Sequence, residues 1–340
     1  MTTIDVGGPS PPKDAPVTDV VYVGGAGRSG STVLALLLAQ LPGFVAVGGL
    51  TNLWERGLQQ NYLCGCGVRF RSCPFWEQVG EEAFHGWDGV NVGDVLRLKA
   101  SVAKYRHWPA YLAPRVGREF FANAAEYSGY TTRVYSAIST VSGAKRVIDN
   151  SHDISPALLL GRTRGLQAHV IHLVRDSRGV AFSLARYVAR AEATSAPVYM
   201  PRHAAFRAST EWLVANLPYH LVPSRRLPRL RVRYESLVAS PANEIRRIVE
   251  FLGESPADTA LAVYDEDPIE IAENHMVSGN PHRLGRKGIE LRLDDEWRVA
   301  MKPADRLITT LLTLPLSVAY GYVGGRSSWT RRHGPTTPGE

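Results

Sequence analysis

The sequence predicts a single α/β domain with a central, mostly parallel sheet flanked by helices. Short apolar runs alternate with helical patterns, the first run leads into a glycine-rich loop, and no linker rich in Gly, Ser or Pro divides the chain. The 340 residues are 44% hydrophobic and 21% charged, which excludes a disordered or disulfide-stapled chain. We expect a disordered tail over residues 1–17, one domain over 18–325 with a phosphate-binding loop like a P-loop, and a flexible tail over 326–340.

Five apolar or β-branched runs are the predicted strands. Such near-continuous apolar strands are expected where helices cover both faces of a sheet. The runs are Val20–Val23, Phe44–Val47, Arg146–Asp149, Ala168–Val174 and Leu230–Tyr234. Two helical insertions are predicted between them, one from Leu50 to Gly143 and one from about Ala204 to Val222.

Two parts of the chain bear on its location. The first residues lack the basic and apolar regions of a secretory signal. Leu307–Val323 carries no charge and is close to the lower limit of roughly 17 residues for a membrane span, but its Thr and Ser residues and Pro315 favour a buried terminal helix. We expect a cytoplasmic protein without stable membrane insertion.

The charge balance favours an anionic ligand. Lys and Arg total 39 and Asp and Glu total 32, a net charge of +7, and only six of the 39 cations are lysine. Arginine binds phosphate and carboxylate in a planar, bidentate way, although a GC-rich genome that favours arginine codons would give the same composition. Arg229, Arg231 and Arg233 alternate along one strand, where a solvated edge explains them, so we expect no nucleic-acid partner.

The strongest local signal follows the first strand. Gly24-Gly-Ala-Gly27-Arg28-Ser29-Gly30-Ser31-Thr32 joins this strand to an apolar helix. Glycines and a helix N-terminus at one spot make an anion site, to which Arg28 and the three hydroxyl groups add donors.

The loop departs from two better-known nucleotide loops. It has the Walker A spacing of Gly25, Gly30 and Thr32, but Ser31 stands at the lysine position. It also fits G-x-G-x-x-G, yet the acidic residue that a dinucleotide enzyme needs about 20 residues later is absent from Phe44–Leu50. Both departures favour a phosphate ligand other than a Mg-bound triphosphate or a nicotinamide dinucleotide.

Two further basic segments are candidate anion sites. The fourth strand ends at Arg175, and Ser183 follows two turns into the next helix, so both could grip one phosphate. A late segment, Gly279-Asn-Pro-His-Arg283-Leu-Gly-Arg286-Lys287-Gly288, reads as a cationic loop.

Together these segments resemble the sulfotransferases that use 3′-phosphoadenosine 5′-phosphosulfate (PAPS) and release 3′,5′-bisphosphoadenosine (PAP). The resemblance extends from about Val20 to Tyr322 and is strongest to bacterial members, whose C-x-C-G…C-P-F-W and G-N-P-x-R stretches recur at Cys64–Trp76 and Gly279–Arg283. It implies a sulfuryl transferase for a hydroxyl of a small-molecule or lipid-linked acceptor. The sequence defines neither the acceptor nor the oligomeric state.

The resemblance also assigns roles. It implies that Gly27, Arg28, Ser29, Gly30, Ser31 and Thr32 bind the 5′-phosphosulfate. Arg175 and Ser183 would hold the 3′-phosphate, Tyr234 would lie near the adenine, and Arg283, Arg286, Lys287 and Gly288 would close over the donor. Arg28 would also stabilise charge in the transition state. We expect no metal requirement, because the leaving group is a phosphate already held by cations.

The general base is less well defined. Many bacterial relatives carry a glutamate after the second strand, where this chain has Gly49. Glu55 is an alternative base, although its spacing differs from that of the family's glutamate. His152 ends the third strand, where the family places a catalytic lysine or histidine, and an imidazole with a pKa near 6.5 suits this role. We therefore expect His152 to be the base.

Three cysteines, Cys64, Cys66 and Cys73, fall within ten residues. An odd number in a chain without a signal argues against a disulfide framework. A structural zinc site needs four ligands, and His85 is the one nearby candidate for the fourth. We expect reduced thiols, with a metal or a single disulfide as alternatives.

Two alternative functions remain open. A P-loop kinase of a small metabolite would use Asp149 as its Mg-binding carboxylate. A non-catalytic protein that binds PAPS or PAP would keep the donor site without a working base.

Overall fold

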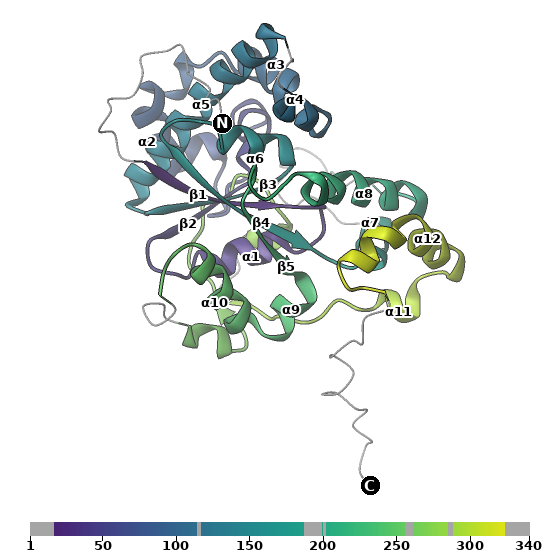
Figure 1. The fold of residues 1–340 in the computed structure, drawn as a ribbon. Helices are drawn as coiled ribbons and strands as arrows, with labels where there is room; N and C mark the ends of the chain where they lie inside the picture. Colours follow the sequence, from purple (N-terminus) through teal and green to yellow (C-terminus); the bar gives the residue numbers. More distant parts are fainter. Residues whose placement is uncertain are drawn as a thin grey trace.

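The computed structural model describes residues 17–113, 117–186, 199, 202–255, 261–284 and 288–323. All five predicted strands form, in one parallel sheet of order β2-β3-β1-β4-β5 (Figure 1). The strands are β1 (Thr18–Gly24), β2 (Phe44–Gly48), β3 (Arg146–His152), β4 (Leu166–Val174) and β5 (Arg229–Arg233). The chain runs to β2 and β3 on one side of β1 and to β4 and β5 on the other. Ligand crevices of open α/β sheets form at such a reversal, beyond the carboxyl ends of the strands.

Both faces of the sheet are covered, as the continuous apolar strands predicted. Val20 and Tyr22 of β1 pack into one core, and Val21 and Val23 pack into the other, because successive side chains of a strand point to opposite faces. The second core includes apolar residues of α1 (Ser31–Leu38) and α10 (Pro241–Phe251), with the short α9 (Tyr234–Ala239) preceding α10.

The long insertion packs on the first face. It begins with a 3-10 turn, Leu50–Asn52, and a π-helical segment, Leu53–Gln59. Its helices lie on the same side of the sheet as α6 (Ile154–Leu160), which follows β3 (Figure 1). The helices of the insertion are α2 (Pro74–Phe84), α3 (Val92–Val102), α4 (Trp108–Leu112) and α5 (Arg118–Ser142). Buried aromatic residues such as Trp54, Trp76 and Tyr127 fill this core, which explains most of the aromatic content of the segment.

A third group of helices flanks the sheet beside β5. It consists of α7 (Ser177–Ala185), α8 (Ala205–Leu221), α11 (Trp297–Ala300) and α12 (Pro303–Ala319). The predicted terminal helix forms as α12, but it is buried on one face only. Leu307, Leu311 and Val318 are exposed, whereas Thr309, Thr313 and Ser317 face inward. Hydroxyl bonds explain this arrangement: Thr313 bonds to Ser177 of α7 at 2.7 Å and to Ser317 at 3.1 Å.

The remaining elements complete the domain. A two-stranded ribbon, β6 (Ile269–Glu270) with β7 (Gly288–Ile289), closes the late part of the chain. Arg286, Lys287 and, apart from Val17, both predicted tails lie outside the described residues. Among the helices that the structure describes, none combines the length and apolar character needed to span a membrane.

Candidate functional site

The glycine-rich loop turns directly from β1 into α1. Gly30 has a φ of 92°, and a Cβ there would lie 2.6 Å from the ring of Tyr234. Only glycine satisfies both the left-handed backbone and this close approach. The turn brings the backbone of the loop and the first residues of α1 to the carboxyl end of the sheet.

A cavity of about 850 Å³ opens at this end of the sheet. Ten of the residues that the sequence singled out line it: Gly27, Arg28, Gly30, Ser31, Thr32, His152, Arg175, Ser183, Tyr234 and Gly288. Ser29 is buried and does not line it. Segments from five distant parts of the sequence therefore meet around one space.

Arg28 joins the two predicted anion sites. Its Nε donates to Ser183 Oγ at 3.0 Å, and Arg175 Nη1 donates to the carbonyl oxygen of Arg28 at 3.1 Å. Burial, followed by the nearby charge of Arg175, lowers the pKa of Arg28 from its ordinary value. Two cations held this close favour an anion between them.

Arg175 is held in place by two other groups. Its guanidinium stacks over the ring of Tyr234 at 4.6 Å, and its Nη2 forms a 2.9 Å ion pair with a carboxylate oxygen of Asp294. Burial raises the pKa of the Tyr234 phenol, so the ring is a neutral platform at neutral pH. Asp294 also lines the cavity and competes for Arg175 with any anion that enters.

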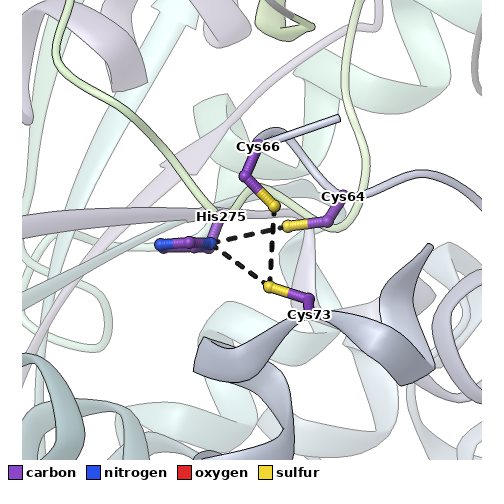
Figure 2. A group of neighbouring side chains, drawn as sticks. All are labelled: Cys64, Cys66, Cys73 and His275. Carbon is purple, nitrogen blue, oxygen red and sulfur yellow. Dashed lines mark hydrogen bonds between the residues drawn. The ribbon is translucent and has the colours of Figure 1, made fainter. Parts of the chain in front are cut away.

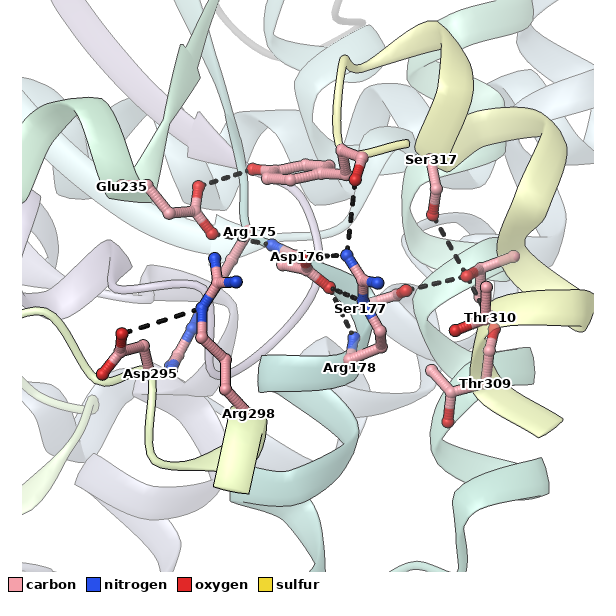
Figure 3. Close-up of polar contacts among 12 residues, drawn as sticks. Arg175, Asp176, Ser177, Arg178, Glu235, Asp295, Arg298, Thr309, Thr310 and Ser317 are labelled. Carbon is pink, nitrogen blue, oxygen red and sulfur yellow. Dashed lines mark hydrogen bonds and ion pairs between the residues drawn. The ribbon is translucent and has the colours of Figure 1, made fainter. Parts of the chain in front are cut away.

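A polar network beside Arg175 fixes the end of β4 (Figure 3). The Asp176 backbone donates to Glu235 at 3.0 Å, and the Asp176 carboxylate accepts from Arg178 at 2.6 and 2.9 Å. The hydroxyl of Tyr322 donates to the other oxygen of Glu235 at 2.7 Å. These bonds connect β4, α9 and the C-terminal segment, which limits the movement of Arg175.

His152 lies at the end of β3 and faces the loop. Its Nε2 is 3.4 Å from Ser31 Oγ, while its carbonyl accepts from the Tyr219 hydroxyl at 2.8 Å and from the Gly25 amide at 3.1 Å. Burial, assisted by the charge of Arg56, lowers the pKa of His152 to about 4. The imidazole is therefore neutral well below pH 6.5, which differs from the near-neutral titration expected from the sequence.

Neither position 49 nor Glu55 supplies a carboxylate to the cavity. Gly49 is held by Ser278, whose Oγ accepts from its amide and donates to its carbonyl, both at 3.1 Å. Glu55 is exposed and does not line the cavity. In the described part of the chain the acidic residues that line it are Glu290 and Asp294.

Asp149 is a buried structural carboxylate. It accepts from the Ser151 hydroxyl at 2.6 Å, the Ser151 amide at 2.8 Å, the Leu50 amide at 3.2 Å and the Tyr135 hydroxyl at 2.5 Å. Burial raises its pKa to about 6. It does not line the cavity, and four donors occupy its oxygens, which disfavours the metal-binding role that a kinase would require of it.

Several residues that line the cavity were not predicted from the sequence. Asn52, Arg56, Asn150, Ser278 and Asn280 all face the cavity. Asn150 is 2% exposed, and its amide atoms have no hydrogen-bond partner among the described residues. The signal available was its place, two residues before His152 near the end of a buried strand.

Arg283 differs most from expectation. It is 1% exposed and does not line the cavity. Its guanidinium donates to the carbonyl oxygens of Met276 at 2.7 Å and Leu63 at 3.0 Å, so it links two chain segments. Asn280, three residues earlier, does reach the site, because its backbone amide donates to Thr32 Oγ1 at 2.9 Å.

Comparisons with solved structures give similar chains at low identity. The sulfotransferase domain of an olefin synthase from Synechococcus PCC 7002 is 21% identical, with 90% of this chain and 97% of that chain covered and a TM-score of 0.43. A sulfotransferase domain from the curacin biosynthetic pathway is 17% identical, with 89% and 98% covered and a TM-score of 0.46. The sulfotransferase STF9 of Mycobacterium avium is 13% identical, with 90% and 78% covered and a TM-score of 0.42.

Most of the chain matches the model of one protein family. No curated protein sequence matches the chain. The model of the sulfotransferase family matches residues 20–258, which span the glycine-rich loop, His152, Arg175, Ser183 and Tyr234. The sequence resemblance is thereby confirmed at the level of the family, and the chain belongs to the sulfotransferase family.

Proposed function

We propose that the protein transfers a sulfuryl group from PAPS to a hydroxyl of a small-molecule or lipid-linked acceptor and releases PAP. The observation that carries the proposal is the contact of Arg28 with both Ser183 and Arg175 at the edge of the cavity. PAPS carries two separated anionic groups and therefore needs two cationic positions. Arg28 follows β1 and Arg175 follows β4, and the contact holds these two cations side by side.

The cavity has properties that suit such a donor. Its volume of about 850 Å³ lies within the range of small-molecule sites. Asn150 supplies amide atoms that have no partner among the described residues and lie in the lining. We assign the 5′-phosphosulfate to Arg28 and the loop as far as Thr32, the 3′-phosphate to Arg175 and Ser183, and the adenine to the surroundings of Tyr234.

The chemistry at the loop is an in-line displacement at sulfur. The donor supplies a sulfuryl group whose bond to the phosphate oxygen breaks, with the electron pair leaving on PAP, as the acceptor oxygen bonds to sulfur. Arg28 and the loop amides stabilise the negative charge on the leaving oxygen. A cation already in position does this without reorganisation when the bond breaks.

His152 accepts the proton of the acceptor hydroxyl in this proposal. Its Nε2 faces the loop beside Ser31. A pKa of about 4 keeps the imidazole neutral and able to accept at pH 7, at the cost of lower basicity. An anionic donor beside it would raise that pKa and strengthen the base.

The test is transfer from PAPS carrying a radiolabelled sulfuryl group to a panel of phenolic, sugar and lipid-linked alcohols. We expect labelled product with wild type, a loss of at least about 100-fold in kcat/KM for Arg28→Ala, and wild-type rates for Arg207→Ala. Arg207 is an exposed residue paired with Glu211, and it serves as the control. PAP binding without any transfer would support the non-catalytic alternative, and phosphoryl transfer from Mg·ATP would support the kinase.

A further inference from the structure

The three cysteines meet a histidine from far along the chain (Figure 2). His275 Nδ1 lies 3.4 Å from Cys73 Sγ and 3.7 Å from Cys64 Sγ, and Cys66 Sγ lies 3.6 Å from Cys73 Sγ. All four ligand atoms fall within 4.8 Å of one another. The partner expected from the sequence, His85, is exposed and not part of this group.

The spacing matches the edges of a metal tetrahedron. Zinc bound to sulfur at about 2.3 Å and to nitrogen at about 2.1 Å places two sulfurs about 3.8 Å apart and a sulfur and nitrogen about 3.6 Å apart. The three short separations here have these lengths. A disulfide would bring two sulfurs to about 2.05 Å, far closer than Cys66 and Cys73 lie.

The surroundings hold these side chains in place. Cys64 and Cys73 are fully buried, and the His275 ring stacks on Phe75 with a centroid distance of 4.5 Å and an angle of 7°. Trp76 Nε1 donates to the His275 carbonyl at 2.9 Å. Outer contacts that fix the ligands in this way are typical of metal sites.

Arg283 connects the two segments that carry the ligands. It binds the carbonyl oxygens of Leu63 and Met276, the residues next to Cys64 and His275. The Gly65 amide also donates to the Met276 carbonyl, at 3.1 Å. The buried arginine thus joins the two segments that carry Cys64 and His275.

We propose that Cys64, Cys66, Cys73 and His275 bind one structural zinc ion. Three thiolates and one imidazole are ligands that zinc prefers. Four protein ligands leave no open position for substrate, so the ion stabilises the structure and takes no part in sulfuryl transfer. This site is separate from the cavity, because none of its four ligands lines it.

The ion also supports one wall of the cavity. The segment that follows His275 makes three hydrogen bonds towards the cavity. The Val277 amide donates to the Val47 carbonyl at 2.9 Å, and the Ser278 hydroxyl donates to the Gly49 carbonyl. The backbone amide of Asn280 donates to Thr32 Oγ1. Zinc therefore anchors the segment that leads to the glycine-rich loop. This consequence rests on the proposed function, whereas zinc binding does not.

Elemental analysis of the full chain, purified without a histidine tag, tests the site. We expect about one zinc ion per chain in wild type and in the control His85→Gln, and less than about one tenth in Cys73→Ser and His275→Gln. Zinc at full occupancy in both ligand variants would overturn the proposal. So would a metal-free wild type, or a Cys66–Cys73 disulfide in protein that was alkylated before unfolding.

A spectroscopic measurement covers the case in which the variants do not fold. Wild-type chain grown with cobalt should show the visible d–d bands of tetrahedral cobalt and a thiolate charge-transfer band, and their absence would contradict the ligand set. PAP affinity is the second readout. Release of zinc by a thiol-specific mercurial should weaken PAP binding, because the segment from His275 to Asn280 would lose its anchor beside the glycine-rich loop. A wild type that holds zinc but does not bind PAP would refute the proposed function and leave the zinc site standing.

Discussion

Arg28 Nε donates to Ser183 Oγ at 3.0 Å, although the two residues lie 155 positions apart. Arg28 belongs to the loop after β1, and Ser183 lies on α7, after β4. Because β1 and β4 are neighbouring parallel strands, both residues emerge at the same edge of the sheet. The hydrogen bond connects two predicted anion sites that lie far apart in the sequence.

Ser183→Ala should weaken PAP binding about tenfold. The substitution removes a hydrogen bond to a charged partner, worth about 1.5 kcal/mol, together with a donor to the 3′-phosphate. Calorimetric titration measures it. The control is Ser142→Ala, which removes a hydroxyl bonded to the Ile138 carbonyl on α5; equal affinities of the two variants would show that Ser183 plays no part in binding.

Asp294→Asn should tighten PAP binding severalfold. The carboxylate forms a 2.9 Å ion pair with Arg175 and lines the cavity. Its loss leaves the Arg175 cation to the ligand and removes the repulsion between the carboxylate and the phosphates of PAP. The side chain is 39% exposed, which limits the gain to about 1 kcal/mol. Asp295→Asn is the control because Asp295 pairs with Arg298 instead. Weaker binding by Asp294→Asn alone would mean that Asp294 orients Arg175 for the ligand.

Gly30→Ala should lower the free energy of unfolding by about 2 kcal/mol or more. Its φ of 92° costs about 1–3 kcal/mol for a side chain, and its Cβ would overlap the Tyr234 ring. Gly27→Ala, where a Cβ has no atom within 4 Å, should stay within about 1 kcal/mol of wild type. Urea unfolding compares the two, and equal losses would argue against the described loop conformation.

His152 should make stability depend on pH. Its folded pKa of about 4 lies below the unfolded value of about 6.5, so below pH 6.5 the unfolded chain takes up a proton that the folded chain does not. The stabilising contribution is complete above pH 6.5 and declines as the pH falls towards 4. Between pH 7.5 and 5.5, wild type should lose about 1.4 kcal/mol more than His152→Gln. The same loss in both proteins, measured by urea unfolding, would show that His152 titrates normally.

The sheet was predictable because its strands are buried on both faces. The run Val20–Val23 is hydrophobic at every position, a pattern expected where helices cover both faces of a sheet. The glycine-rich loop was predictable because its glycines and hydroxyl residues stand directly between an apolar strand and an apolar helix. Both signals are local in the sequence.

The features missed depend on contacts between distant segments. His275 stands 202 positions from Cys73, so spacing pointed to His85 instead. Arg283 carries the positive charge of an anion-binding residue, yet two carbonyl groups take up its guanidinium. The threonines of α12 face inward because Ser177 of α7 offers a hydroxyl partner. Composition alone contains no information about such partners.

The lowered pKa of His152 is a further effect of tertiary structure. The residue type predicts a group that titrates near pH 6.5, but burial beneath the loop and the charge of Arg56 favour the neutral ring. Position at a strand end was enough to predict its place and not its acidity.

The central claim is that the cavity binds a 3′-phosphorylated adenosine donor. Calorimetric titration of wild type with PAP, AMP and Mg·ATP tests it most directly, because PAP and AMP differ in the 3′-phosphate alone. We predict micromolar or tighter binding of PAP, binding of AMP weakened at least about 100-fold by loss of the Arg175 contact, and no saturable binding of Mg·ATP. Equal affinities for PAP and AMP, or binding of Mg·ATP alone, would contradict the account.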